Sequence, residues 1–221
     1  ACRLAQLTHA PNLSYIAGGS GAVNPRLEPL VPSSCDQRNL RAESVLPLPD
    51  VILLEGRGDA IDVFFAGGLQ IDARGNCNLV CVGDPARPKL RGPGTVGLPF
   101  LPRAGRVVIY TMSQNPRTLV ERVDVVSGPG FLDGPEAWER LGAPGGGPAL
   151  VVTPLCVMDF DPDSRRMRLQ SVHPGVTVEQ VRENTGFELP APPRVPVTPE
   201  PEGRELEILR RLDPLGVLRG A

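Results

Sequence analysis

The chain has 221 residues, of which 41% are hydrophobic, as expected for a globular protein with one large domain or two small ones. Lys and Arg number 23 against 25 Asp and Glu, so the net charge of −2 argues against a nucleic-acid partner. The apolar runs are far shorter than the roughly 20 residues of a membrane-spanning helix, so no membrane segment is predicted. The cysteines, at 2, 35, 77, 81 and 156, lack metal-finger or disulfide-framework spacing, which favours a cytoplasmic location and no metal site.

The N-terminal part of the chain changes its pattern twice within 50 residues. Leu4, Leu7 and Thr8 have helical spacing and predict the last turns of a helix that ends before Pro11. Residues 13–17 predict a strand, so the pattern indicates a fold whose first strand and most of whose first helix are absent from this sequence. Residues 22–50 are rich in proline and predict a long irregular excursion with one short helix.

Dense apolar runs in the middle of the chain predict buried strands. They cover 60–72, 78–84 and 106–112, with a strand pair over 149–161 and a further strand over 165–175. Residues 50–58 are compatible with a helix, and 117–128 predict a short helix with a strand. This alternation predicts an α/β fold with an open, mainly parallel sheet and flanking helices.

The C-terminal third predicts two helices separated by a linker. Residues 177–186 form a short helix, with Thr177 and Gln180 placed as in a capping box and Gly186 at its end. Leu206, Leu209 and Leu212 form one stripe of a final helix. The predicted organisation is an α/β domain over 1–189, a proline-rich linker over 190–203 and a docking helix over 204–221.

A glycine-rich stretch, "YIAGGSGAVNP" at 15–25, is the first candidate site. Gly18, Gly19 and Gly21 suit the approach of backbone amides to a ligand, yet no side chain here can act as a carboxylate or a base. The stretch is either a reactive loop without its reactive group or a tight turn.

Two other stretches combine glycine with polar residues. In 67–78, Gln70 and Asp72 fit a hairpin turn, which the spacing favours over a binding site. In 83–97, several glycines accompany Arg87, Lys89 and Arg91, so that amides and cations could hold a carbonyl oxygen or an anion; the alternative is a mobile surface loop. His9 and His173 have no partner typical of catalysis and are interpreted as structural, and Trp138 as a packing anchor.

Five motifs resemble the beta subunit of a class I coenzyme A transferase of the glutaconate CoA-transferase type, from residue 1 to about 215. They are "THAPN", "GGLQIDARGNCN", "GDPARPKLRGPG", "VDVVSGPGFLDGPEAWERLG" and "VHPGVTVEQVRENTGFEL". The resemblance implies a CoA-transferase (NagB/RpiA-like) fold, and a homologous alpha subunit as the partner in a heterodimer or higher heterooligomer. It further implies acyl-CoA and carboxylic acid substrates, with coenzyme A as a cosubstrate and no permanently bound cofactor.

The resemblance also places the catalytic position of the family in this chain. The beta subunits usually carry a nucleophilic glutamate in a Glu-Ser-Gly-like motif after a strand, and the match here is Gly19, Ser20 and Gly21. No catalytic residue is therefore assigned: Ser20 lacks a neighbouring base, and Glu28 could reach the site only if the excursion folds back. A second glycine-rich segment of the family, which stabilises an oxyanion through amides, falls at 94–97, where Val96 replaces a glycine.

The missing glutamate leaves the reaction open. The chain is also similar to a CoA-transferase-like, ring-opening hydrolase of steroid degradation, which uses a carboxylate of its alpha subunit. The sequence thus predicts a transferase subunit without the covalent glutamate. The alternatives are a CoA-dependent carbon–carbon hydrolase subunit or a non-catalytic, CoA-binding one. The predicted substrate and CoA contacts are Gly19, Ser20, Gly21, Gln70, Asp72, Asn76, Gly94, Thr95 and Gly97.

Overall fold

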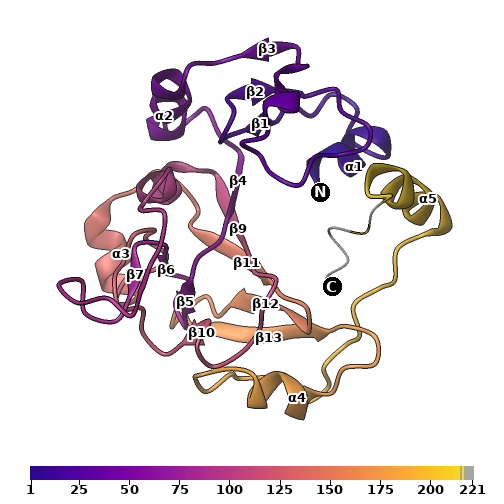
Figure 1. Ribbon diagram of the computed structural model, residues 1–221. Coiled ribbons are helices and arrows are strands. Elements are labelled where there is room, and N and C mark those ends of the chain that lie inside the picture. The colour runs from indigo at the N-terminus through magenta and orange to yellow at the C-terminus, as the bar shows by residue number, and fades with distance from the viewer. Residues whose placement is uncertain (215, 217–221) are drawn as a thin grey trace. The chain divides into compact units, whose positions relative to one another are not determined.

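A computed structural model of the chain describes residues 1–214 and 216, in two compact units (Figure 1). Unit 1 comprises Ala1–Leu53 with the described residues from Glu200 onward, and unit 2 comprises Leu54–Pro199. The domain organisation expected from the sequence pattern, with an α/β domain over 1–189, stays a prediction beside this division into two units. None of the helices in the described ranges is long and apolar enough to cross a membrane.

The helices are α1 (Cys2–Leu7), α2 (Leu48–Gly56), α3 (Pro135–Leu141), α4 (Val178–Glu183) and α5 (Gly203–Leu212), with the 3₁₀ turns η1 (Gln37–Leu40) and η2 (Leu98–Arg103). The longer strands are β4 (Val63–Ala66), β9 (Arg106–Tyr110), β11 (Pro148–Val152), β12 (Cys156–Phe160) and β13 (Met167–Val172). The shorter strands are β1 (Ile16–Ala17), β2 (Ala22–Val23), β3 (Ser44–Val45), β5 (Gln70–Asp72), β6 (Cys77–Asn78), β7 (Cys81–Val82), β8 (Leu90–Arg91) and β10 (Leu119–Val120).

A five-stranded sheet of order β13-β12-β11-β9-β4 forms the centre of unit 2 (Figure 1). Strands β4, β9 and β11 are parallel, whereas β11, β12 and β13 pair antiparallel. The predicted α/β class with parallel strands and flanking helices is confirmed, in a sheet that is mixed. The prediction that 60–72 is one buried strand was wrong. The run breaks at Gly67 and Gly68 into β4 and β5, and β4 is an edge strand on which Phe65 is 42% exposed.

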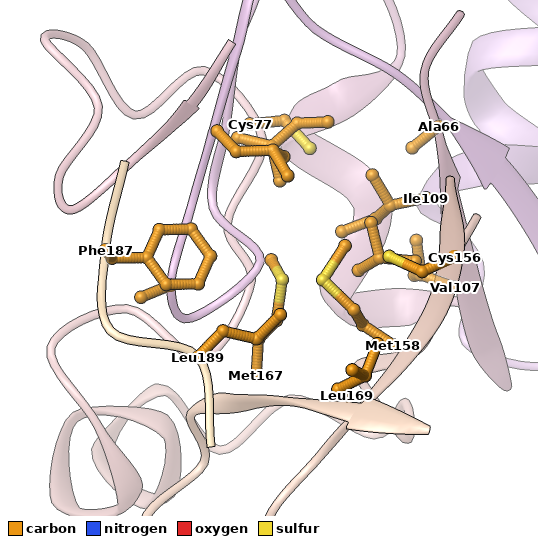
Figure 2. Packing of buried hydrophobic residues seen from close by; sticks show 14 of the residues in the cluster. Ala66, Cys77, Val107, Ile109, Cys156, Met158, Met167, Leu169, Phe187 and Leu189 are labelled. Atoms are coloured by element: carbon orange, nitrogen blue, oxygen red, sulfur yellow. The ribbon is translucent and has the colours of Figure 1, made fainter. Parts of the chain in front are cut away.

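The hydrophobic core of unit 2 lies against this sheet. Alternate residues of β9, Val107 and Ile109, are fully buried, as the period of a strand requires. Figure 2 shows Met158 and Met167 in the middle of the cluster, between Phe187 and Ile109. Each large side chain buried in this way contributes about 1.5–3 kcal/mol.

A second, smaller sheet of order β10-β5-β6 carries the polar motif of 67–78. Strand β5 pairs parallel with β10 and antiparallel with β6. Residues 116–118 form a turn and residues 121–127 contain bends, so the short helix predicted within 117–128 is wrong. Side-chain hydrogen bonds of Asp124 and Ser127 to other parts of the unit replace helical ones there.

Helix α4 begins with the predicted capping box. Thr177 Oγ1 accepts a bond from the Gln180 amide at 3.2 Å, and Gln180 Oε1 accepts one from the Thr177 amide at 2.9 Å. The helix ends at Glu183, before the predicted stop at Gly186, because the Gly186 amide donates to the Leu119 carbonyl (2.8 Å) instead.

The proline-rich segment of 190–199 is fixed to unit 2. The amides of Leu169 and Val172 donate to the carbonyls of Pro190 (2.8 Å) and Pro196 (3.0 Å), and the Thr198 amide donates to the Val172 carbonyl (2.7 Å). The segment therefore runs along β13 in place of spanning open solvent.

Unit 1 is built from a small antiparallel sheet, β1-β2-β3, and the contacting helices α1 and α5. A C-terminal helix is present as α5: Ile208 and Leu212 are buried, and the helix stops before Pro214. Residues 215 and 217–221 of the predicted docking helix over 204–221 lie outside the described residues. The Leu30 amide donates to the Leu212 carbonyl at 2.8 Å, which ties the irregular excursion to α5.

Candidate functional site

The glycine-rich stretch of 18–21 forms the turn between β1 and β2. The Ala17 carbonyl accepts bonds from the amides of Ser20 (3.0 Å) and Gly21 (2.9 Å) and from Ser20 Oγ (3.2 Å). Gly21 has a φ of 69°, and a Cβ there would overlap the Leu46 carbonyl oxygen. The turn thus requires glycine at 21, and the Ser20 hydroxyl is bonded to the backbone without a base.

The space beside Gly19 is occupied by residues of the excursion. A Cβ at Gly19 would lie 3.0 Å from Ser34 Oγ and 3.2 Å from the Cys35 amide nitrogen, and it would overlap Cys35 Sγ. The thiol of Cys35 therefore lies where the side chain of a glutamate at 19 would begin. The sequence did not predict a role for Cys35 in the site, because nothing in the sequence indicates that Cys35 and Gly19, which are 16 residues apart, lie close together.

Glu28 is bound in two ion pairs of unit 1. Its Oε1 accepts from Arg3 Nη2 at 3.1 Å, and its Oε2 lies 3.3 Å from Arg211 Nε. Both carboxylate oxygens are thus held by guanidinium groups on α1 and α5. This arrangement fits a structural link better than a free nucleophile.

Asp72 and Asn76 form a buried network at the β5–β6 turn. Asp72 accepts bonds from the amides of Arg74 (2.9 Å) and Asn76 (3.0 Å) and from Asn76 Nδ2 (3.0 Å). Asn76 is 3% exposed, and its Oδ1 accepts bonds from the amides of Gly130 (2.8 Å) and Leu132 (3.0 Å). Burial raises the pKa of Asp72, and these hydrogen bonds oppose that rise.

Gln70, on the same strand as Asp72, forms a second set of hydrogen bonds that leads toward the β7–β8 hairpin. Its Nε2 donates to Asp124 Oδ2 at 3.0 Å, and its Oε1 accepts from Asn78 Nδ2 at 2.7 Å. Asp124 Oδ2 also accepts from the Gly83 amide at 2.7 Å. The polar side chains of 70–78 therefore join two of the motifs recognised in the sequence, 67–78 and 123–142, to each other.

The second glycine-rich segment leads from β8 into η2. The amides of Gly92 and Gly94 donate to the carbonyls of Val80 (2.8 Å) and Leu79 (3.2 Å), and the Thr95 carbonyl accepts from Leu98 (3.1 Å). Val96, which stands where the resemblance implies a glycine, has a φ of 51°. A β-branched residue in this left-handed conformation is strained, so the backbone here keeps a glycine-like shape.

Glu55 of α2 packs against this segment, a contact that the sequence did not predict. A Cβ at Gly97 would lie 2.8 Å from Glu55 Cδ and 2.9 Å from Oε1, so the carboxyl group rests on the glycine backbone. Among the described residues, the buried Oε2 atom has no hydrogen-bond partner. Burial raises the pKa of Glu55. Such a carboxyl group can take up a proton next to Gly97.

The histidine interpretation is consistent with the geometry in unit 2. His173 Nε2 lies 2.9 Å from the Thr153 carbonyl, and its Nδ1 lies 3.1 Å from Thr198 Oγ1.

Cys77 is fully buried, and burial raises its pKa to about 12. Over residues 1–214 and 216, no group of three or more His, Cys, Asp or Glu side chains is placed to hold a metal ion.

A polar cleft of about 550 Å³ opens beside α1 in unit 1. Gln6, Asn24, Arg3 and Arg26 line it, and each of these arginines is ion-paired with a glutamate. The cleft is thus electrostatically balanced, and none of its lining residues was predicted as a substrate contact.

Comparison with known proteins identifies similar chains for nearly the whole sequence. A family model described as coenzyme A transferase matches residues 54–184. The beta (B) subunit of the 3-oxoadipate CoA-transferase of Pseudomonas knackmussii is 36% identical over 215 residues, which cover 96% of this chain and 82% of that protein. The cholesterol ring-cleaving hydrolase IpdB subunit of Rhodococcus jostii is 31% identical over 223 residues, covering 96% of this chain and 80% of that protein.

A solved structure is also similar over nearly the whole chain. The glutaconate coenzyme A-transferase of Acidaminococcus fermentans superposes with a TM-score of 0.83 at 30% sequence identity. The match covers 96% of this chain and 84% of that one, so it includes residues of both units.

We expect substitution of Gly21 to cost more than substitution of Gly19. Gly21→Ala adds a Cβ in a left-handed conformation against a backbone carbonyl and should lower the free energy of unfolding by roughly 2–4 kcal/mol. Gly19→Ala meets two side-chain ends that can rotate and, less closely, the Cys35 amide nitrogen, so about 1 kcal/mol is expected, reduced when Cys35→Ala is added. Urea denaturation measures both, and equal costs at 19 and 21 would contradict the geometry.

Removal of the Asn76 side chain should destabilise the chain. Asn76→Ala leaves one buried amide, one partly buried amide and part of the Asp72 carboxylate unpaired, so a loss of roughly 3 kcal/mol or more is expected in thermal or urea unfolding. Asn184→Ala, which removes one exposed bond, should cost about 1 kcal/mol or less. If Asn76→Ala kept full stability yet lost CoA affinity, the side chain would be a ligand contact and not a scaffold.

Glu55→Gln should stabilise the chain at neutral pH. Because the folded pKa of Glu55 is raised, its ionisation costs stability as pH rises from the ordinary glutamate range through the folded pKa. The variant should therefore gain roughly 1 kcal/mol over wild type at pH 7 and match it at low pH, as measured by urea unfolding across pH. Glu183→Gln, at an exposed glutamate, is the control. An advantage independent of pH would refute burial of the charge as the cause.

Proposed function

The chain belongs to the coenzyme A transferase family, and from that premise we propose that it is the beta subunit of an enzyme that moves coenzyme A between carboxylic acids. Similarity to the beta subunits of two transferases supports this proposal. The proposed partner is a homologous alpha subunit, and the proposed substrates are an acyl-CoA and a free carboxylic acid. Coenzyme A enters as a cosubstrate.

The turn at 18–21 carries the mechanistic part of the proposal. In a covalent CoA transfer, a carboxylate oxygen attacks the thioester carbonyl, the C–S bond breaks, and an acyl anhydride and CoA thiolate result. The thiolate then attacks the enzyme acyl carbon and releases the first acid. Gly19 offers no carboxylate, and Cys35 fills the adjoining space, so we propose that the attacking carboxylate comes from outside this turn, on the alpha subunit.

The candidate binding residues fall into two groups in this proposal. In unit 1, Gly19, Ser20 and Gly21 are candidate backbone contacts for the substrate. In unit 2, the backbone amides of Thr95 and Gly97 are proposed to stabilise the developing oxyanion, because the Gly94 amide already donates to the Leu79 carbonyl at 3.2 Å. Gln70, Asp72 and Asn76 act indirectly, because their polar atoms hold the loops of unit 2 together.

A second candidate function is CoA-dependent carbon–carbon hydrolysis. Two observations favour it: the 31% identity to a protein named as part of a cholesterol ring-cleaving hydrolase, and the absence of a carboxylate at 19. In that reaction water adds to the substrate, so no acyl acceptor is consumed. Glu55, next to Gly97, would suit a proton-accepting role on this chain.

Isotope exchange in the two-subunit enzyme tests the proposal. The enzyme should move labelled free acid into acyl-CoA, and borohydride treatment during turnover should modify a glutamate of the alpha subunit, with none modified at residues 15–25 of this chain. Modification on this chain would overturn the proposed source of the carboxylate. Incorporation of ¹⁸O from water into a ring-opened product, without acid exchange, would replace transfer by hydrolysis. An enzyme with neither activity on a panel of acyl-CoAs would argue against both.

A further inference from the structure

The β7–β8 hairpin of unit 2 carries cations that have no partner in the described part of the chain. Arg87, Lys89 and Arg91 are exposed, and none of them makes an ion pair or a side-chain hydrogen bond there. Many arginines elsewhere in unit 2 are paired, such as Arg166 with Glu121 at 2.9 Å and Arg168 with Asp159 at 2.7 Å. Lys89 is also the single lysine of the 221-residue sequence.

The strand register places two of these cations on one face of the hairpin. Arg91 pairs with Cys81, and Leu90 with Val82. Because side chains alternate along a strand, Lys89 and Arg91 point to the same side and Leu90 to the other. The stem of Lys89 passes close to Gly83, whose missing Cβ would lie 3.4 Å from Lys89 Cγ.

The base and the turn of the hairpin are both held by hydrogen bonds. At the base, Asp124 Oδ2 accepts from the Gly83 amide at 2.7 Å. At the turn, Asp84 Oδ1 accepts from the Ala86 amide at 2.8 Å, and the Arg87 amide donates to the Asp84 carbonyl at 2.9 Å. The acidic residue of the hairpin is thus used by the turn itself. The three cations are left with no anion of the described chain and present a positive surface.

This arrangement suits phosphate groups. Guanidinium groups bind phosphate through paired N–H donors, and lysine adds a mobile point charge. The substrate class of the family carries its phosphates at the nucleotide end of coenzyme A, a pantetheine arm away from the thioester. Gly94 to Gly97 follow Arg91 by three to six residues, a reach of at most about 10–21 Å. One CoA molecule can therefore extend from the hairpin toward the glycine-rich segment.

We propose that Arg87, Lys89 and Arg91 of the β7–β8 hairpin bind the phosphate groups of the coenzyme A nucleotide. The identity of this ligand rests on the proposed function, whereas the positive surface does not. Coenzyme A carries two kinds of phosphate that these cations could bind, the pyrophosphate and the 3′-phosphate. Binding measurements with ligands that lack one or both of them distinguish the two.

Calorimetry on the two-subunit enzyme tests the assignment. The triple variant R87A/K89A/R91A should weaken binding of coenzyme A by about 10- to 100-fold at low salt, because three exposed charge contacts are lost. Binding of pantetheine, which has no phosphate, should be unchanged. The matched control R117A/R182A/R194A removes three exposed arginines of unit 2 that form no ion pair within the described residues, and it should bind coenzyme A like wild type.

The ligand series identifies which phosphate is held. A loss that is smaller for 3′-dephospho-CoA than for coenzyme A assigns the 3′-phosphate, and equal losses assign the pyrophosphate. Coenzyme A affinity equal to that of the control variant would overturn the proposal. So would an equal loss for pantetheine, since that result indicates general damage to the unit.

The single lysine allows a second measurement that needs no variant. Coenzyme A should slow acetylation of Lys89 by an amine-reactive reagent, followed by mass spectrometry of this chain, and pantetheine should not. Unchanged labelling with saturating coenzyme A would count against the proposal. An enzyme that protects Lys89 but turns over no acyl-CoA would sink the proposed function alone, whereas normal turnover and binding by the triple variant would sink this inference alone.

Discussion

The buried hydrogen bonds between Asp72 and Asn76 hold the β5–β6 turn and the loop at 130–132 together. A carboxylate that is 4% exposed needs donors, and it finds them in the turn that it closes and in the asparagine side chain. That asparagine fixes the loop at 130–132 through its amide oxygen. On the same strand as Asp72, Gln70 bonds separately to Asp124, which in turn holds the β7–β8 hairpin. The loops of unit 2 can therefore lack regular secondary structure and still be well positioned.

The sequence predicted what depends on local rules. The capping box of α4, the paired strands β11 and β12, and the stripe of α5 follow from spacing within a few residues, and each is present. The short helix expected after Arg117 failed because Asp124 and Ser127 bond to residues distant in sequence, which periodicity does not register. The prediction of one strand over 60–72 was wrong because it was based on the apolar content of the run and did not take the two glycines at 67 and 68 as a break.

The candidate site also has a part that the sequence predicted and a part that it did not. Glycines at 19–21 and 94–97 could be located from the sequence because a family pattern marks them. What surrounds them could not: Cys35 reaches Gly19 across the turn between β1 and β2, and Glu55 reaches Gly97 from α2. Both contacts depend on tertiary packing, and neither partner belongs to a motif. The motifs thus indicated where the glycine-rich segments lie, and the structure supplied the side chains that lie beside them.

The proline-rich segment beside β13 affects the outer boundary of the sheet. The carbonyls of Pro190 and Pro196 accept bonds from β13, but a prolyl nitrogen has no hydrogen to donate in return. A foreign strand that approached this side would find a backbone short of donors, so the edge is a poor template for pairing between chains. Residues that look like a simple spacer in the sequence therefore also protect the exposed end of a five-stranded sheet from aggregation.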